Sequence, residues 1–81
     1  MSVKVRFFAS LRERLGRTEE VVVFESGDTA GRIWAKATGE AALPSHIFIA
    51  VNQQYAREDS VVADGDEVAF LPPVTGGSNE G

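Results

Sequence analysis

Hydrophobic and polar residues alternate near the start of the chain, between residues 3 and 9. Because successive side chains of a strand point to opposite faces, this alternation predicts a strand with one buried face. Phe8 is the exception, since it is an aromatic residue on the otherwise polar face. A second strand is predicted over residues 19–24, where a run of valines followed by a phenylalanine gives high β-propensity.

Two helical segments are expected in the first half of the chain. Between the two strands, Ser10 and Glu13 have the spacing of a capping box, which predicts a short helical turn. Gly16 is expected to end that turn, because glycine adopts the left-handed conformation common after a helix.

The longer helix is predicted to begin at Asp28 or Thr29, either of which can cap it. From Ala30 onward, apolar side chains recur at i, i+3, i+4 and i+7, which places them on one helix face. Gly39 is expected to end the helix. We expect Trp34, which lies on the apolar face, to anchor the core rather than to stack on a ligand.

The second half of the chain predicts two or three further strands. Residues 47–51 form a continuous apolar run, which is typical of a central strand. A turn is expected at residues 52–54, and residues 55–62 contain one short strand or extended stretch. An Asp-Gly pair within residues 63–66 predicts a tight turn. The last strand is then expected over residues 67–71, and the prolines that follow end it because they lack a backbone N–H.

These elements predict the fold class. One helix with one apolar face needs one sheet to cover it, so we expect a two-layer α+β domain. The most economical arrangement is a β-grasp, the ubiquitin-like fold, in which a mixed sheet packs on one main helix. The first and last strands would then lie side by side at the centre of the sheet. We predict a β-grasp domain over residues 1–71 and an extended, flexible C-terminal tail over residues 72–81.

Composition and charge exclude several kinds of function. The sequence contains no cysteine and one histidine, so disulfides, thiolate nucleophiles, zinc–thiolate sites and histidine-rich metal sites are not expected, and no cofactor is expected. The formal net charge of −4 disfavours nucleic-acid binding and suits docking on basic protein partners. No apolar run approaches the roughly 20 residues of a membrane span, so no membrane partner is expected. The charged start is unlike a signal peptide, so a cytoplasmic location is expected.

The polar residues form no recognisable catalytic set. Asp64, Asp66 and Glu67 lack the further ligands of a calcium loop, so we expect a solvated turn there. His46 lies in a proline-containing loop and is not paired with a recognisable nucleophile. Residues 27–31 lack the spacing and the lysine of a phosphate-binding loop, so the chain is not expected to bind ATP by itself.

The C-terminal tail carries the candidate reactive group. Two prolines favour an extended base, and two glycines leave a tip without side chains that a narrow channel of another protein could enclose. The alternative is a frayed terminus without a function. The residues expected to matter are Pro72, Pro73, Val74, Thr75, Gly76 and Gly77.

Two apolar side chains are predicted to lie exposed beside this tail. If Val68 and Phe70 face the core, the alternation along the strand turns Leu71 outward, and the same argument turns Phe8 outward. Adjacent first and last strands would bring these two side chains together, as part of a docking patch. Scattered exposed apolar residues are also normal in proteins that dock nothing there.

Most of the chain, from Val3 to Gly77, resembles the small subunit of molybdopterin synthase. The resemblance rests on VKVRFFA at residues 3–9 with LRE at 11–13, on AVNQ at 50–53, and on DGDEVAFLPPVTGG at 64–77. The last stretch is the most specific. Thiamine-type sulfur carriers share the fold and the Gly-Gly end, but they generally lack this stretch and rank second.

The resemblance implies a sulfur carrier for molybdenum cofactor biosynthesis, a non-catalytic subunit of a sulfurtransferase complex. An ATP-dependent, E1-like adenylyltransferase would adenylate the carboxylate of Gly77, and a sulfur donor protein would convert it to a thiocarboxylate. The tail would enter the large synthase subunit, within a heterotetramer, where the sulfur attacks a precursor pterin. The resemblance also implies that Phe8, Tyr55 and Leu71 contact the large subunit.

The sequence departs from this family after Gly77, because it continues over residues 78–81. The carboxyl group of Gly77 forms a peptide bond with Ser78 and cannot be adenylated in that form, so we expect Gly77 to become the terminus before sulfur loading. Either a protease removes these residues, or they are foreign to the native chain, or this form is inactive. Two other functions stay open: a ubiquitin-like modifier joined to lysines through Gly77, and a plain interaction module with an inert tail.

Overall fold

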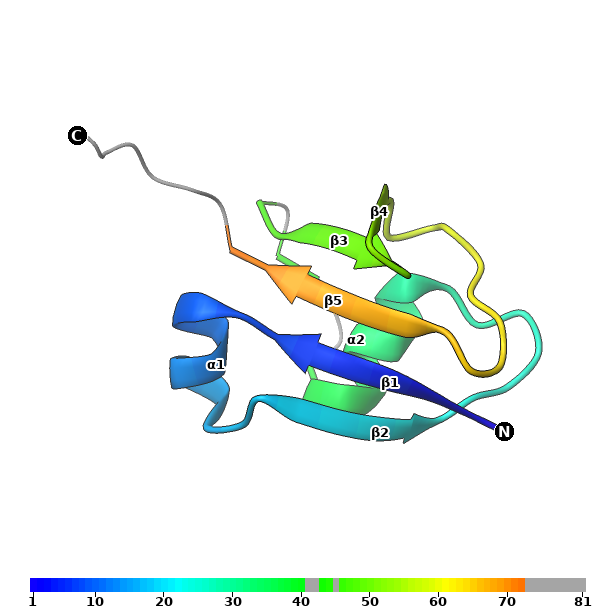
Figure 1. Cartoon of the computed structure of the whole chain (residues 1–81), viewed down its shortest axis with the longest axis horizontal. Coiled ribbons are helices and arrows are strands. Elements are labelled where there is room, and N and C mark those ends of the chain that lie inside the picture. Colours follow the sequence, from blue (N-terminus) through cyan, green and yellow to red (C-terminus); the bar gives the residue numbers. More distant parts are fainter. Residues whose placement is uncertain (41–42, 45, 73–81) are drawn as a thin grey trace.

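The computed structural model describes residues 1–40, 43–44 and 46–72 (Figure 1). Within these ranges the chain forms a five-stranded sheet and two helices. The elements are β1 (Ser2–Phe7), α1 (Ala9–Leu15), β2 (Glu19–Val23), α2 (Ala30–Thr38), β3 (Phe48–Val51), β4 (Gln54–Ala56) and β5 (Glu67–Leu71). No helix within these ranges is long and apolar enough to cross a membrane.

The strands lie in the order β2-β1-β5-β3-β4, so the last strand occupies the middle of the sheet. β1 pairs with β5 in parallel and with β2 antiparallel, while β3 pairs antiparallel with both β5 and β4. The predicted β-grasp, with first and last strands side by side, is confirmed. The segment expected as a central strand, β3, is an interior strand next to β5.

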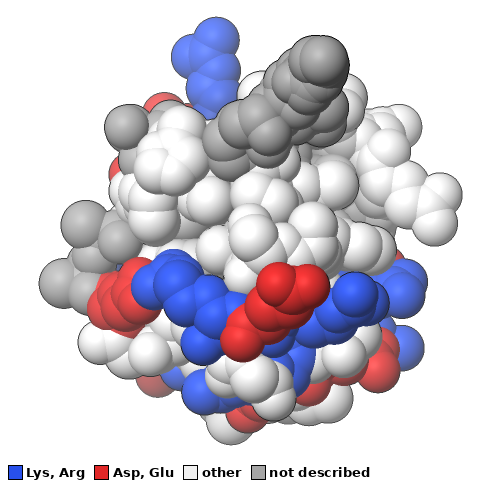
Figure 2. All heavy atoms as spheres, turned by 90° about the vertical axis from the view of Figure 1, so that its left-hand side faces the viewer, with Lys and Arg blue, Asp and Glu red and all other residues white. Residues whose placement is uncertain are grey.

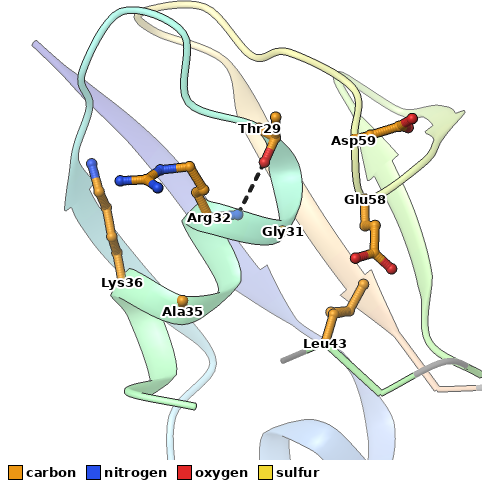
Figure 3. Close-up of a pocket in the computed structure, with 8 residues that line it drawn as sticks. All are labelled: Thr29, Gly31, Arg32, Ala35, Lys36, Leu43, Glu58 and Asp59. Carbon is orange, nitrogen blue, oxygen red and sulfur yellow. Dashed lines mark hydrogen bonds between the residues drawn. The ribbon is translucent and has the colours of Figure 1, made fainter. Parts of the chain in front are cut away.

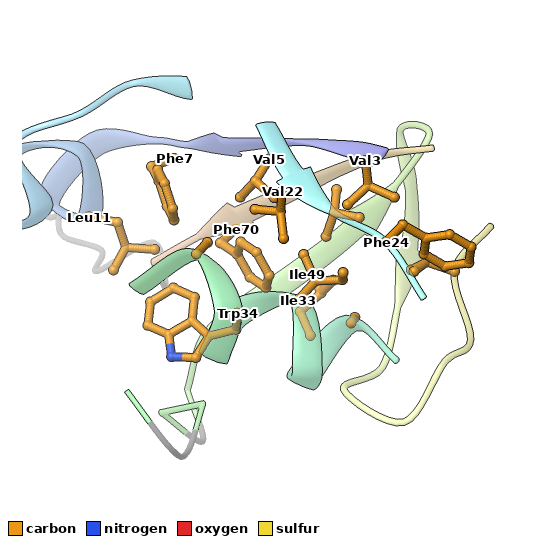
Figure 4. Close-up of a cluster of buried hydrophobic side chains, with 14 residues drawn as sticks. Val3, Val5, Phe7, Leu11, Val22, Phe24, Ile33, Trp34, Ile49 and Phe70 are labelled. Atoms are coloured by element: carbon orange, nitrogen blue, oxygen red, sulfur yellow. The ribbon is translucent and has the colours of Figure 1, made fainter. Parts of the chain in front are cut away.

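The core lies between the sheet and α2, which covers one face of the sheet (Figures 1 and 4). Trp34 of α2 is fully buried, as predicted, and meets Phe70 edge to face with ring centroids 5.0 Å apart. Phe7 of β1 completes the aromatic cluster, at 6.2 Å from each of the other two rings. Val68 is also fully buried, so the predicted inward face of β5 is correct. Both central strands are therefore fastened to the helix by their aromatic side chains.

Helix α2 begins and ends where the sequence signals predicted. The Thr29 hydroxyl accepts a hydrogen bond from the Arg32 backbone N–H at 3.2 Å, so Thr29 rather than Asp28 is the N-cap. Gly39 follows the helix with a φ of 79°, in the left-handed region where glycine is favoured.

The capping box predicted at Ser10 and Glu13 is wrong. Phe8 is the N-cap residue of α1, and no side chain caps this helix. The Phe8 N–H still donates to the Phe70 carbonyl at 3.3 Å, so strand pairing extends through Phe8 and the chain turns abruptly at Ala9, whose φ is 52°. Ser10 therefore lies inside the first turn instead of ahead of it. The predicted end of this helix at Gly16 is confirmed.

The remaining predicted segments agree in outline with the structure. The short strand β4 begins at Gln54, one residue before the stretch expected over residues 55–62, and the later part of that stretch forms an isolated bridge between Val61 and Thr29. Of the predicted tail over residues 72–81, Pro72 is described and residues 73–81 lie outside the described residues.

Substituting the central tryptophan tests the core. Trp34→Ala is expected to lower the free energy of unfolding by about 3–5 kcal/mol, because it removes a buried aromatic side chain and leaves a cavity. That is a large share of the roughly 4–12 kcal/mol expected for a chain of this size. Urea unfolding measures the change, with Val21→Ala as a control, since Val21 is 67% exposed. A loss below about 1 kcal/mol for Trp34→Ala would contradict this role.

Candidate functional site

The described part of the candidate site is the point where the tail begins. β5 is held on one side by β1 and on the other by β3, and its last residue, Leu71, is in register with Phe48. Pro72 follows directly and is half-buried. The predicted tail residues Pro73, Val74, Thr75, Gly76 and Gly77 lie outside the described residues. The tail therefore starts from the central strand of the sheet, which is paired on both sides.

An exposed aromatic pair lies next to this point, on the face of the sheet opposite α2. Tyr55 is 84% exposed and Phe48 is 51% exposed, and their ring centroids lie 6.2 Å apart. Ala50 of β3 is in register with Tyr55 of β4 and with Ala69 of β5. The apolar surface therefore extends across these three strands. We define the outer patch as Phe8, Phe48, Ala50, Tyr55, Ala69 and Leu71.

Phe8 and Leu71 lie side by side in the structure, but they are less exposed than expected. Phe8 follows β1 at the position next to Leu71 in the parallel register, and both side chains are half-buried. The guanidinium carbon of Arg6 lies 5.3 Å from the centre of the Phe8 ring, a distance typical of a cation–π contact. The same guanidinium lies 3.3 Å from the Glu67 carboxylate. The expected exposed pair is thus a partly covered pair, and Arg6 provides part of the cover.

Phe48 is a member of the outer patch that the sequence did not reveal. It belongs to a continuous apolar run, and such a run does not show which of its side chains face the core. The pairing of Phe48 with Leu71 and of Ile49 with Phe70 decides the matter, because Phe70 is buried. Ile49 faces α2 and Phe48 faces out.

The outer patch is bordered by charged residues. On β1 and β2, Lys4 lies 3.4 Å from Glu19, next to the pair of Arg6 and Glu67. At the end of the molecule where β5 stops, charged side chains gather in a band over α1, and the surface above this band is largely uncharged (Figure 2). Largely uncharged surface therefore adjoins the C-terminal end of β5.

A buried carboxylate lies elsewhere, at the start of α2. Asp28 is 3% exposed and accepts hydrogen bonds from the Lys36 ammonium, from the Arg32 guanidinium at 3.1 Å and from the Glu25 N–H at 3.0 Å. The hydrogen bond from Lys36 is the main reason why the pKa of Asp28 is lower than usual. The sequence suggested Asp28 as a cap and did not show this ion pair.

A hollow of about 510 Å³ lies beside α2 (Figure 3). Arg32 and Lys36 line one side of it, and Glu58 and Asp59 line the other. Both cations are bonded to Asp28, and Lys36 also lies 3.6 Å from the Glu25 carboxylate, so two carboxylates balance the two positive charges. Their position fits a structural role in fastening the start of the helix.

The described residues contain no cluster of three or more His, Asp or Glu side chains that could hold a metal ion. Asp64 and Asp66, which the sequence placed in a turn, bond to backbone groups instead. Asp64 accepts from the Ser2 N–H at 2.7 Å, and Asp66 accepts from the Ala63 N–H at 2.8 Å. These carboxylates hold the turn before β5 in place.

A model of the ThiS family matches residues 5–77. The molybdopterin synthase sulfur carrier subunit of Escherichia coli (strain K12) is 40% identical over 80 residues, which cover 93% of this chain and 99% of the relative. The subunit of the same name from Mycobacterium tuberculosis (strain ATCC 25618 / H37Rv) is 37% identical over 82 residues, covering 95% and 99%.

Solved structures with the same fold carry two kinds of name. SAMP1, small archaeal modifier protein 1, from Haloferax volcanii has a TM-score of 0.82 at 29% identity, covering 95% of this chain and 100% of its own. A protein–protein complex of subunits 1 and 2 of molybdopterin-converting factor from Helicobacter pylori 26695 contains a chain with a TM-score of 0.63 at 25% identity, covering 95% and 100%.

The buried carboxylate generates a prediction about pH. Because the pKa of Asp28 is lower in the folded chain, its contribution to stability is fully present above the unfolded-state pKa of about 3.9 and is lost as the pH falls through the folded-state value. Asp28→Asn is therefore expected to lower the free energy of unfolding at pH 7 and to approach the wild type below about pH 4. Urea unfolding across a pH series tests this, with the exposed Asp59→Asn as control. A difference that stays constant into acid would contradict it.

Proposed function

The chain belongs to the ThiS family, and from that premise we propose that it is the sulfur carrier of molybdopterin synthesis. The observation that carries the proposal is the similarity along nearly the whole chain to proteins named molybdopterin synthase sulfur carrier subunit. The matched family region ends at Gly77, the residue to which we assign the reactive carboxyl group.

The chemistry follows from the weak reactivity of a carboxylate. An oxygen of the Gly77 carboxylate attacks the α-phosphorus of ATP, pyrophosphate leaves, and an acyl-adenylate forms on an E1-like adenylyltransferase. Sulfur at the oxidation level of sulfide, supplied by a sulfur donor protein, then attacks the acyl carbon of Gly77; the bond to AMP breaks, AMP leaves, and a thiocarboxylate remains. Because the sequence has no cysteine, the chain has no thiol of its own, and its terminus is where sulfur would be carried. The chain is a co-substrate that its partners load and unload.

In this proposal the folded body positions the tail. β5 is paired on both sides, so Leu71 is a fixed starting point. At about 3.3–3.6 Å per residue, an extended chain from Leu71 reaches Gly77 within roughly 20 Å. The outer patch adjoins Leu71 and docks on the large synthase subunit, which receives the tail. The reaction centre of that subunit then lies within the same distance of the docked patch.

The large subunit is the partner that the comparisons favour. The Helicobacter pylori neighbour is a complex of two subunits of molybdopterin-converting factor, and its similar chain is matched over its whole length. We propose an analogous complex here, a heterotetramer, in which Phe8, Tyr55 and Leu71 contact the large subunit. Phe48 joins them because it is exposed beside Tyr55.

A second candidate function is that of a ubiquitin-like modifier. The similarity to SAMP1, a modifier protein by its name, favours it. The activation of Gly77 would be the same, but a lysine amine would displace AMP and form an isopeptide bond. Recovery of lysine-linked conjugates from cells would favour this function. A thiamine-type carrier would load sulfur equally well. Transfer of the sulfur to a precursor pterin in the presence of the large subunit would distinguish the first proposal from this alternative.

Shortening the tail tests the role of Gly77. A chain that ends at Gly77 is expected to gain a thiocarboxylate when incubated with the adenylyltransferase, ATP and the sulfur donor, whereas a chain that ends at Gly76 is expected to stay unloaded. Both should unfold at the same urea concentration, because Gly77 lies beyond β5. Intact-mass measurement detects the replacement of oxygen by sulfur. Loading of the full chain without loss of residues 78–81 would show that Gly77 need not be the terminus.

Truncating the exposed aromatic pair tests the docking role. Phe48→Ala and Tyr55→Ala are each expected to weaken binding to the large subunit by about tenfold, which corresponds to about 1.4 kcal/mol. Stability should change little, since both side chains are more than half exposed. Isothermal titration calorimetry measures the affinity, and Val61→Ala is the control because Val61 is exposed outside the outer patch. Unchanged affinity for both aromatic variants would exclude the patch from the interface.

A further inference from the structure

A second surface meets the start of the tail. A hollow of about 560 Å³ lies at the C-terminal end (the foot) of β5, where Pro72 forms part of its wall. We call it the foot hollow and define it by Ser10, Leu11, Arg14, Glu40, Pro44, His46, Ile47 and Pro72. It shares no residue with the outer patch, although Leu71 of that patch precedes Pro72 directly. Two different surfaces therefore reach the same point of the chain.

The lining of the foot hollow suits an apolar occupant. Its apolar members are buried or half-buried, with Leu11 at 4% exposure, so they form the inner wall. Its exposed members are Ser10, Arg14 and His46, which form a polar rim. Arg14 lies 3.0 Å from Glu40, so these two opposite charges pair with each other at the rim. In Figure 2 the charged band over α1 gives way to uncharged surface toward the start of the tail.

The position of Pro72 indicates which partner covers the hollow. A protein that encloses the tail as far as its base at Pro72 comes close to both surfaces, because Pro72 lines the foot hollow and follows Leu71 of the outer patch. Contact with the outer patch alone would hold this point from one side. Contact with both would fix the rotation of the domain about the tail, and with it the direction in which the terminus enters the partner. Orientation of this kind contributes strongly to reaction rates.

We propose that the large subunit of molybdopterin synthase places an apolar side chain in the foot hollow when the outer patch docks. This inference rests on the proposed function and adds a second contact surface to it. The inner wall supplies apolar contact, and the rim supplies hydrogen-bonding groups around the inserted side chain. The start of the tail is then held between two surfaces of one partner.

Filling the hollow with a bulky side chain tests the inference. In a chain that ends at Gly77, Ser10→Trp and His46→Trp each add an indole at the rim from a different element of the wall. We expect each to weaken binding to the large subunit at least tenfold in isothermal titration calorimetry. The matched control is Arg12→Trp, which lies on the same helix but about 200° around it from Ser10. It should stay within about twofold of the wild type.

Two further measurements separate the possible outcomes. Urea unfolding shows whether a variant is folded, and if Ser10→Trp is not, the exposed loop variant His46→Trp decides. Sulfur loading by the adenylyltransferase shows whether the variant is impaired only in binding the large subunit. Weakened binding with normal loading supports the inference.

Three results would overturn it. If both filling variants bind the large subunit like the wild type, the hollow lies outside the interface, and the proposed sulfur-carrier function stands without it. If they bind normally but load poorly, the occupant belongs to the adenylyltransferase. If the wild type itself neither loads sulfur nor binds the large subunit, the proposed function fails, and this inference fails with it.

Discussion

The parallel pairing of the first and last strands is the constraint on which the rest of the structure depends. β1 and β5 are neighbours in space, but most of the chain lies between them. A parallel pair cannot be closed by a tight turn, so the helices and the other strands form one long connection. The aromatic cluster of Phe7, Trp34 and Phe70 fastens both strands to α2. The strand that leads to Gly77 is thus held in place only when the whole domain is folded.

The two surfaces at the end of β5 follow from this arrangement. Alternation along the strand sends Phe70 into the core and Leu71 outward, next to the exposed aromatic residues of β3 and β4. The next residue, Pro72, contacts the other side, where α1 and the segment before β3 leave a hollow. Helix α1 contributes its buried Leu11 and its exposed Ser10 and Arg14 to this hollow beside Pro72.

The acidic side chains at the start of α2 and before β5 have structural partners within the part of the chain that the structure describes. The buried carboxylate of Asp28 is bonded to two cations and to a backbone N–H, and the aspartates before β5 hold a turn. Each of these polar groups thus has a structural partner. In the proposed function, reactivity belongs to Gly77 and to the proteins that act on it, while the folded body supplies position and recognition.

The sequence by itself determined the elements of this fold, because strand alternation, the apolar face around Trp34 and the stops at Gly16 and Gly39 depend on near neighbours in the chain. It also predicted a tail, through a proline and glycine pattern that needs no contacts, and that prediction stays open because residues 73–81 lie outside the described residues. Only the tertiary structure decided what depends on pairing between distant segments. The backbone bond from Phe8 to Phe70 displaced the predicted helix cap, and strand register turned Phe48 outward. The foot hollow is lined by three segments that are separate in the sequence, so no local pattern could have predicted it.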